Sequence, residues 1–313
     1  MRNGRRKTNE RNESPAARAA TTRSTVPPHL AGTTWVQHET AAATAAFGDL
    51  KRDLKALKKK VTANRVHRVR VTLRRWFSIW KVLQDDGWES KKFKNGIGKT
   101  LKKLQKLLGK LRDTDVNLEQ AEKFGCGERL IELWKAQRRM QKEHLEKFVD
   151  DSDFKSLLKD LRAYIKRRSQ HIESKLPRAK SSQSAFNHLE LYLMAQENTV
   201  REQSDTASTP DEYHQLRLSI KCWRYLLTEF FGLTNLELVR AQQLLGQLHD
   251  IDRLTPMLMN DDEQRQALTR AKQRKEELLA QINEMRPRLP YGLRPQVSSP
   301  RGAFPAASGW VRT

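Results

Sequence analysis

The chain has 313 residues, of which 60 are Lys or Arg and 37 are Asp or Glu, so its formal net charge is +23 at pH 7. Such an excess of positive charge indicates an anionic partner. The chain contains only two cysteines, which excludes a secreted scaffold held by disulfides and favours a cytoplasmic location. No apolar run approaches the roughly 20 residues of a membrane-spanning helix.

Both ends of the chain differ in composition from the part between them. Residues 1–40 are rich in Arg, Thr, Ala and Pro and show no helical periodicity, and residues 287–313 contain five prolines. We expect both to be disordered tails. Residues 41–286 have helical periodicity and predict an all-α domain. The expected helices lie at about 42–60, 63–84, 91–109, 115–124, 127–149, 153–175, 182–197, 211–231, 235–248 and 262–285, with a polar linker at 196–212.

The positive charge is concentrated near the start of this helical region. Residues 51–112 contain 21 Lys or Arg but only four acidic residues. An ordinary solvated helical surface mixes the two signs of charge. The segment therefore predicts a surface directed at an anion.

Two sequence blocks occur twice, in the same order. The block HRVRVTLRRW at 67–76 matches HQLRLSIKCW at 214–223, and LGKLRDTD at 108–115 matches LGQLHDID at 245–252. Ordered self-similarity of this kind is the signature of an internal repeat. The chain therefore predicts two related helical halves, at 41–150 and 151–286.

The first block places cations and apolar residues on different faces of a helix. At 100° per residue, His214, Arg217, Lys221 and Arg224 form one stripe about 15 Å long. The first copy repeats the stripe with His67. Arg70 and Arg74 complete the stripe of the first copy. The apolar residues lie on a different face of each helix, and they are Val69, Leu73, Trp76, Trp80 and Leu83 in the first copy and Leu216, Ile220, Trp223, Leu227 and Phe230 in the second. An ordinary amphipathic helix with a solvated basic face is the alternative interpretation of each stripe, but the recurrence of the same stripe in both copies favours an anion-binding surface.

The second block has a mainly structural interpretation. Gly109 and Gly246 favour either a close approach between backbones or the end of a helix. Asp113 and Asp250 are expected either to cap the next helix or to hold a neighbouring arginine.

Lysines precede this block at spacings of three and four residues, as Lys99, Lys102, Lys103 and Lys106. We expect them to form a second wall of cations. Arginine grips phosphate oxygens with a planar fork of donors, and lysine supplies a compact charge. Cations spaced along helices suit an extended, repeating anion better than a compact one.

The two paired motifs resemble those of the CHAD family, α-helical domains named for their histidines, and the resemblance covers about residues 41–286. The resemblance implies a fold of two pseudo-symmetric helical bundles with a basic groove between them. It also implies that the protein binds inorganic polyphosphate, and we expect it at polyphosphate granules. Carried over by position, the ligand-binding residues are His67, Arg70, Arg74, Arg75, His214, Arg217, Lys221 and Arg224. Phe77 and Cys222 depart from the family pattern, because both stand where a basic residue is common.

Other functions have less support in the sequence. No Cys-x-x-Cys or His-Glu-x-x-His spacing occurs, so we expect no metal, and the string GIGKT at 96–100 lacks the first glycine and the preceding strand of a phosphate-binding loop. We find no nucleophile–base pair and expect neither enzymatic activity nor a cofactor. Two alternatives remain open, namely nucleic-acid binding without sequence specificity and a granule-surface or nucleoid-associated scaffold whose tails recruit partners.

Overall fold

The computed structural model describes residues 23–25, 35–84, 94–175, 180–259, 262–292, 294–296 and 310–312. Its α-helices are α1 (Trp35–Lys59), α2 (Ala63–Gln84), α4 (Lys99–Phe124), α5 (Glu128–Asp151), α6 (Phe154–Lys175), α7 (Lys180–Thr206), α8 (Pro210–Phe231), α9 (Leu236–Leu258) and α10 (Arg265–Met285). A π-helical turn, η3 (Lys94–Gly98), precedes α4, and 3-10 turns η4 (Asp262–Gln264) and η5 (Arg286–Arg288) flank α10. The predicted all-α fold is confirmed.

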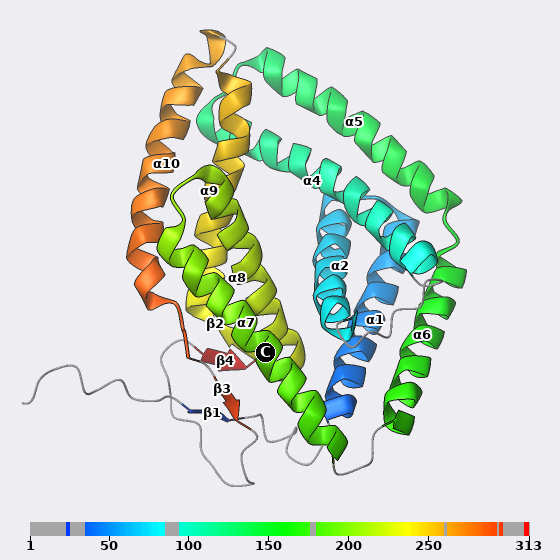
Figure 1. Cartoon of the computed structure of the whole chain (residues 1–313). Helices are drawn as coiled ribbons and strands as arrows, with labels where there is room; N and C mark the ends of the chain where they lie inside the picture. Colours follow the sequence, from blue (N-terminus) through cyan, green and yellow to red (C-terminus); the bar gives the residue numbers. More distant parts are fainter. Residues whose placement is uncertain are drawn as a thin grey trace, which may run out of the picture.

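The helices form two groups that α4 and α5 connect (Figure 1). Helices α1, α2 and α6 lie on one side, and α7, α8, α9 and α10 lie on the other. The antiparallel pair α4–α5 crosses from the first group to the second, and α4 packs on α2 as well as on α9 and α10. Helix α2 packs directly on α8, so the two copies of the first sequence block meet at the centre of the fold.

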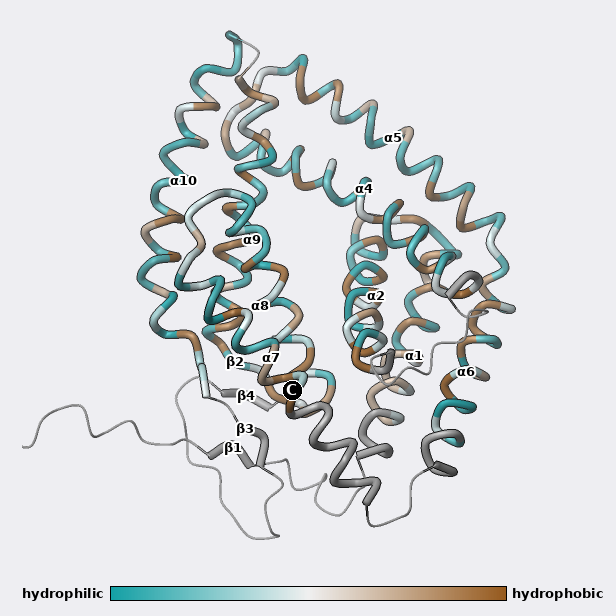
Figure 2. The backbone as a smooth tube through the Cα atoms, in the orientation of Figure 1, coloured by the Kyte–Doolittle hydropathy of each residue, from teal (hydrophilic) through white to brown (hydrophobic). Residues whose placement is uncertain are grey.

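The expected apolar faces form the core. Trp76 and Trp223 are each 1% exposed, and Leu73, Leu216 and Ile220 are completely buried. Hydrophobic and hydrophilic positions alternate along each helix in Figure 2, as expected of amphipathic helices that bury one side. Because the apolar face of each block is buried, its cationic stripe is held beside the core rather than in it.

The segment expected to be a linker, 196–212, is mostly helical. Helix α7 continues to Thr206, and its residues Val200 and Ser204 are buried. Glu197, on the same helix, accepts a hydrogen bond from the backbone N–H of Gly292 at 2.5 Å. The sequence of this segment shows no apolar stripe, because some of its buried positions are polar and form hydrogen bonds with residues distant in the chain. A capping box of Thr209 and Glu212 then starts α8.

Two further boundaries differ from prediction. The helices expected at 91–109 and 115–124 are largely one continuous helix, α4, and the helix expected to end at 248 continues to Leu258 as α9. Asp113 and Asp250 therefore lie inside helices, and the expectation that they cap the next helix is wrong. The predicted division at residue 150 does not separate the two groups of helices either, because α6 packs on α1. The internal duplication itself stays a prediction.

The described structure extends beyond the expected domain at both ends. Helix α1 begins at Trp35, and Leu289 is buried. The ring of Tyr291 stacks on Trp223 with 6.1 Å between centroids. Three-residue strands also pair, β1 (Arg23–Thr25) with β3 (Arg294–Gln296) in parallel and β2 (Leu233–Asn235) with β4 (Trp310–Arg312) antiparallel. The rest of both predicted tails lies outside the described residues.

None of the described helices combines the length and the apolar character that crossing a membrane requires.

Replacing Trp223 with Ala should lower the free energy of unfolding by about 3–5 kcal/mol, because it leaves a cavity in the core. Urea denaturation followed by circular dichroism measures this. Leu218→Ala is the matched control, because Leu218 lies on the same helix and is 40% exposed. An equal loss in the two variants would contradict the assignment of the buried face of α8.

Candidate functional site

The cationic stripes of α2 and α8 merge into one cluster. Burial, and then the positive charge of Arg74, lowers the pKa of Arg70 to about 10, and Arg217 of α8 acts in the same direction. Lys221 is only 9% exposed. Burial, and then the charges of Arg74 and Arg217, lowers its pKa to about 6. Each stripe therefore senses the charges of the other, and the structure brings together cations from both sequence blocks.

Helices α4 and α9 add members that the sequence analysis did not assign to the site. The charges of Arg112 on α4 and Arg253 on α9 act on Arg70 and on Arg217 respectively. His249 precedes Arg253 on α9 and lies against His214 of α8. We use the term cation cluster for Arg70, Arg74, Arg112, Arg217, Lys221, Arg224 and Arg253 together with His67, His214 and His249.

The sequence does contain a signal for two of these additional members, Arg112 and His249, in their position in the second block. They occupy matching places in LGKLRDTD and LGQLHDID, three residues after the glycine. A Cβ atom added to Gly109 would lie 3.0 Å from Nη1 of Arg70. Gly109 lies inside α4 and makes room for the side chain of an arginine of α2, so the expected approach between backbones or helix end is not what this glycine provides. At Gly246 nothing lies within 4 Å of such a Cβ.

Several members of the cation cluster have no counter-ion. Within the described part of the chain, Arg74, Arg217 and Lys221 form no ion pair within 4 Å. Nε of Arg217 is buried without a hydrogen-bond partner there. The only ion pair of Arg70 in that part is with Asp113, at 3.8 Å. Unpaired buried cations are unfavourable, so the cluster is suited to receive negative charge from outside.

The three histidines of the cluster lose proton affinity. Burial, followed by neighbouring arginines, lowers the pKa values of His67 and His214, and lowers that of His249 to about 4. Nδ1 of His214 lies 3.1 Å from Nδ1 of His249. At this distance one nitrogen donates a hydrogen and the other accepts it. The facing nitrogens thus share one proton, and a nearby anion would favour a further proton on the free Nε2 of the donor ring.

Arg75 is placed differently from the other expected ligands. It donates from Nε and Nη2 to both carboxylate oxygens of Glu229, at 2.6 and 3.0 Å, and from Nη1 to Asp49 at 3.1 Å. Glu229 is on α8 and Asp49 is on α1. Arg75 therefore ties three helices together, and three of its five N–H donors are already engaged. A role of Arg75 in ligand binding was implied only by its position in the motif shared with the CHAD family, and it stays a prediction.

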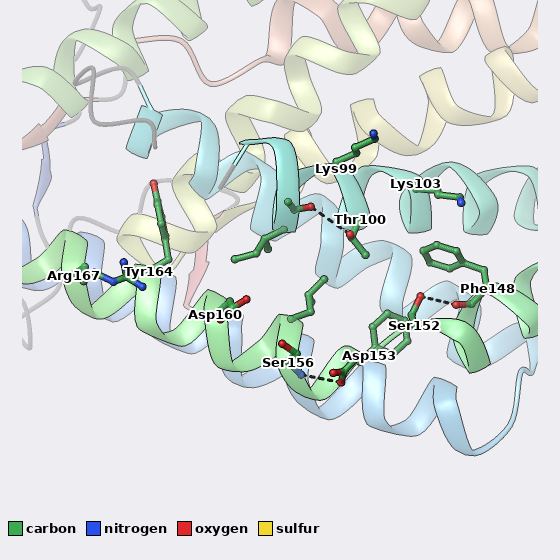
Figure 3. Close-up of a pocket in the computed structure, with 14 residues that line it drawn as sticks. Lys99, Thr100, Lys103, Phe148, Ser152, Asp153, Ser156, Asp160, Tyr164 and Arg167 are labelled. Carbon is green, nitrogen blue, oxygen red and sulfur yellow. Dashed lines mark hydrogen bonds between the residues drawn. The ribbon is translucent and has the colours of Figure 1, made fainter. Parts of the chain in front are cut away.

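The four lysines of α4 do not all face the cluster. All are exposed. Lys102 and Lys106, seven and three residues before Gly109, share the face of α4 that approaches Arg70. Lys99 and Lys103 instead line a pocket of about 660 Å³ between α4, the end of α5, and α6. Figure 3 shows this pocket.

The pocket differs from the cation cluster in chemistry. Nζ of Lys103 lies 5.1 Å from the centre of the Phe148 ring. Buried Phe154 and Tyr164 contribute apolar surface. The lining also carries both signs of charge, with Asp153 and Asp160 beside the lysines and Arg167 (Figure 3). Of the lysines expected to form a second wall of cations, Lys99 and Lys103 therefore line this pocket instead, and the part of all four in ligand binding stays a prediction.

Metal-ligating side chains do not gather anywhere in the described part of the chain, where no group of three or more His, Cys, Asp or Glu could hold an ion.

The fold and the site together define an all-α domain with a shared cationic centre, in which cations outnumber their acidic partners in the described part of the chain. The family model of the CHAD domain matches residues 41–258, and the chain belongs to the CHAD family. It is also similar to the crystal structure of the CHAD domain from the plant Ricinus communis, with a TM-score of 0.62 and 18% identity, covering 82% of this chain and 92% of that one. No curated protein matches the chain.

Replacing Arg75 with Ala should destabilise the fold, because it leaves the carboxylate of Glu229, 5% exposed, without its hydrogen-bonded partner. We expect a loss of about 1–3 kcal/mol in the free energy of unfolding. Thermal denaturation measures it. Arg74→Ala, one position earlier on α2, should instead leave the melting temperature unchanged or raise it. Equal destabilisation by both variants would contradict the distinction between paired and unpaired arginines.

Proposed function

We propose that this protein binds inorganic polyphosphate in the cation cluster. The observation that carries the proposal is the convergence of Arg70, Arg74, Arg217 and Lys221 from two helices, with a single carboxylate within 4 Å of them in the described part of the chain. Guanidinium groups bind phosphate oxygens through paired, charge-assisted hydrogen bonds. A polyanion supplies the negative charge that the cluster lacks.

The shape of the cluster favours an extended ligand over a compact one. Its cations follow α8 for about 15 Å and α2 for about 10 Å, at 1.5 Å per residue, and Lys102 and Lys106 continue along α4. A single phosphate meets only two or three of these groups. A chain of phosphates contacts many of them at once, so that their contributions add on one molecule.

Membership of the CHAD family supports this choice of polyanion, because the motifs that carry the resemblance are the ones that build the cluster. Location at polyphosphate granules is part of the same proposal, since it follows from binding the polymer there. We propose a binding role without catalysis and without a cofactor.

Binding to nucleic acid is the alternative, favoured by the net charge of +23. Duplex DNA also carries closely spaced phosphates. Competition between long-chain polyphosphate and duplex DNA of equal phosphate content, at physiological salt, separates the two. Polyphosphate should displace DNA at equal phosphate content, because its flexible chain can follow the cations of α2, α8 and α4 more closely than a stiff duplex can. Preferential retention of DNA would overturn the proposal.

Replacing Arg217 with Ala should weaken polyphosphate binding by about ten- to a hundredfold, the loss of one or two charged hydrogen bonds. The logarithm of affinity should fall roughly linearly with the logarithm of salt concentration, with a smaller slope in the variant. Titration calorimetry at several salt concentrations tests both. Arg129→Ala is the matched control, because this arginine is exposed on α5 and outside the cluster. Equal loss in the two variants would indicate binding to diffuse charge.

Binding should tighten as the pH falls from about 8 to about 6. In the free protein the pKa of Lys221 is lowered to about 6, and those of His67, His214 and His249 are lowered as well. A bound polyanion favours the protonated forms and raises these pKa values, so protons are taken up on binding. Calorimetry in buffers of different ionisation enthalpy measures that uptake.

Lys221→Met should reduce the proton uptake at pH 7, because it removes a group that is mostly neutral in the free protein and becomes protonated when the polyanion binds. Affinity that did not change with pH would show that these groups do not meet the ligand.

A further inference from the structure

Each copy of the second sequence block carries two aspartates, and they face different ways. Asp115 accepts a hydrogen bond from Nε of Arg138 on α5, and Asp252 accepts one from Nζ of Lys275 on α10, both at 2.6 Å. These two aspartates tie the outer helix to the inner one in each half. Asp113 and Asp250 precede them by two residues and lie on the side of the cation cluster.

Asp113 stands between arginines of two different helices. Its Oδ1 is 3.8 Å from Nη2 of Arg70 on α2 and 3.4 Å from Nη1 of Arg253 on α9. Its negative charge also acts on Arg217 of α8. A carboxylate carried by α4 thus sits where three other helices direct guanidinium groups.

The contacts of Asp113 are loose compared with those of the outward aspartates. Both exceed the range of about 2.7–2.9 Å for a charged N–H···O hydrogen bond, whereas Asp115 and Asp252 have contacts of 2.6 Å. The Asp113 side chain is 41% exposed, so water reaches it. Such a group can leave its two arginines without breaking a close hydrogen bond.

We propose that Asp113 is a specificity-determining residue that occupies the place of one phosphate in the free protein and is displaced from Arg70 and Arg253 when a polyanion binds. This inference rests on the proposed function and concerns how the same site selects its ligand. The negative charge of the carboxylate offsets the repulsion between the two guanidinium groups until the phosphate of the ligand replaces it.

The consequence is discrimination by chain length. A single phosphate that displaces Asp113 gains only the contacts that the carboxylate gave up. A polyphosphate that displaces it also reaches Arg74 and Arg217, which have no ion pair in the described part of the chain, and Lys221, which takes up a proton when the polymer binds. Asp113 therefore penalises orthophosphate in proportion more than it penalises the polymer.

Asp113→Asn tests the inference, because the substitution removes the charge and keeps the shape. Calorimetry at physiological salt would compare orthophosphate with long-chain polyphosphate. The affinity for orthophosphate should rise by about tenfold and that for polyphosphate by about two- to threefold, as expected from removing one partly solvated competing charge. The selectivity for the polymer should therefore fall.

Asp252→Asn is the matched control. It removes the same charge from the corresponding block, but its carboxylate pairs with Lys275 on the outer side of α9. It should leave the ratio of the two affinities at the wild-type value. Asp113→Glu restores the charge and should return selectivity toward wild type. If Asp113→Asn does not fold, as judged by circular dichroism, Asp113→Ser removes the same charge in its place.

The outcomes separate this inference from the proposed function. Wild-type protein that does not bind polyphosphate would overturn the function. Wild-type protein that binds polyphosphate, combined with an Asp113→Asn variant whose affinity ratio equals that of Asp252→Asn, would overturn the role of Asp113 and leave the function intact. Weaker binding of both ligands by Asp113→Asn would also overturn the proposed role, because it would mean that the carboxylate positions the arginines for the ligand instead of competing with it.

Discussion

Repulsion among like charges held at the contact of two helices is the constraint on which the site depends. Arg70 and Arg74 of α2 meet Arg217 and Lys221 of α8, and burial of Lys221 lowers its pKa to about 6. Charges brought together in this way oppose folding. The packing of the buried apolar faces beside them, including Trp223, outweighs that cost, so the fold holds the cations in place until an anion neutralises them.

The charged residues of this chain divide into two kinds by the partners they have. Arg75 with Glu229, Arg138 with Asp115 and Lys275 with Asp252 each form a contact of 2.6 Å between different helices. These pairs fix how the helices lie against one another. In the cation cluster, Arg112 has a close pair with Glu119 at 2.7 Å, Arg70 and Arg253 have only the loose contacts of Asp113, and Arg74, Arg217 and Lys221 have no ion pair in the described part of the chain. A strongly basic chain can in this way use some of its cations for structure and keep others available for a ligand.

The helical spacing of the sequence predicted which residues share one face of a helix, but not which residues of different helices contact each other. The buried face with Trp76 and the adjacent row with Arg70 and Arg74 follow from 3.6 residues per turn, and both are found. Pairing of Arg75 with a carboxylate 154 residues away leaves no local signal. For the same reason the outward turn of Lys103 toward Phe148 and the contact of His249 with His214 were not foreseen, since both arise from packing between helices.

A crystal structure of the protein with bound polyphosphate tests the central claim most directly. The account predicts phosphate density in contact with the guanidinium groups of Arg70, Arg74 and Arg217 and with Nζ of Lys221, at the contact of α2 and α8, and Asp113 turned away from Arg253. Phosphate density confined to the outer surfaces of α4 and α5, with the central cations unchanged and Asp113 still between its two arginines, would contradict it.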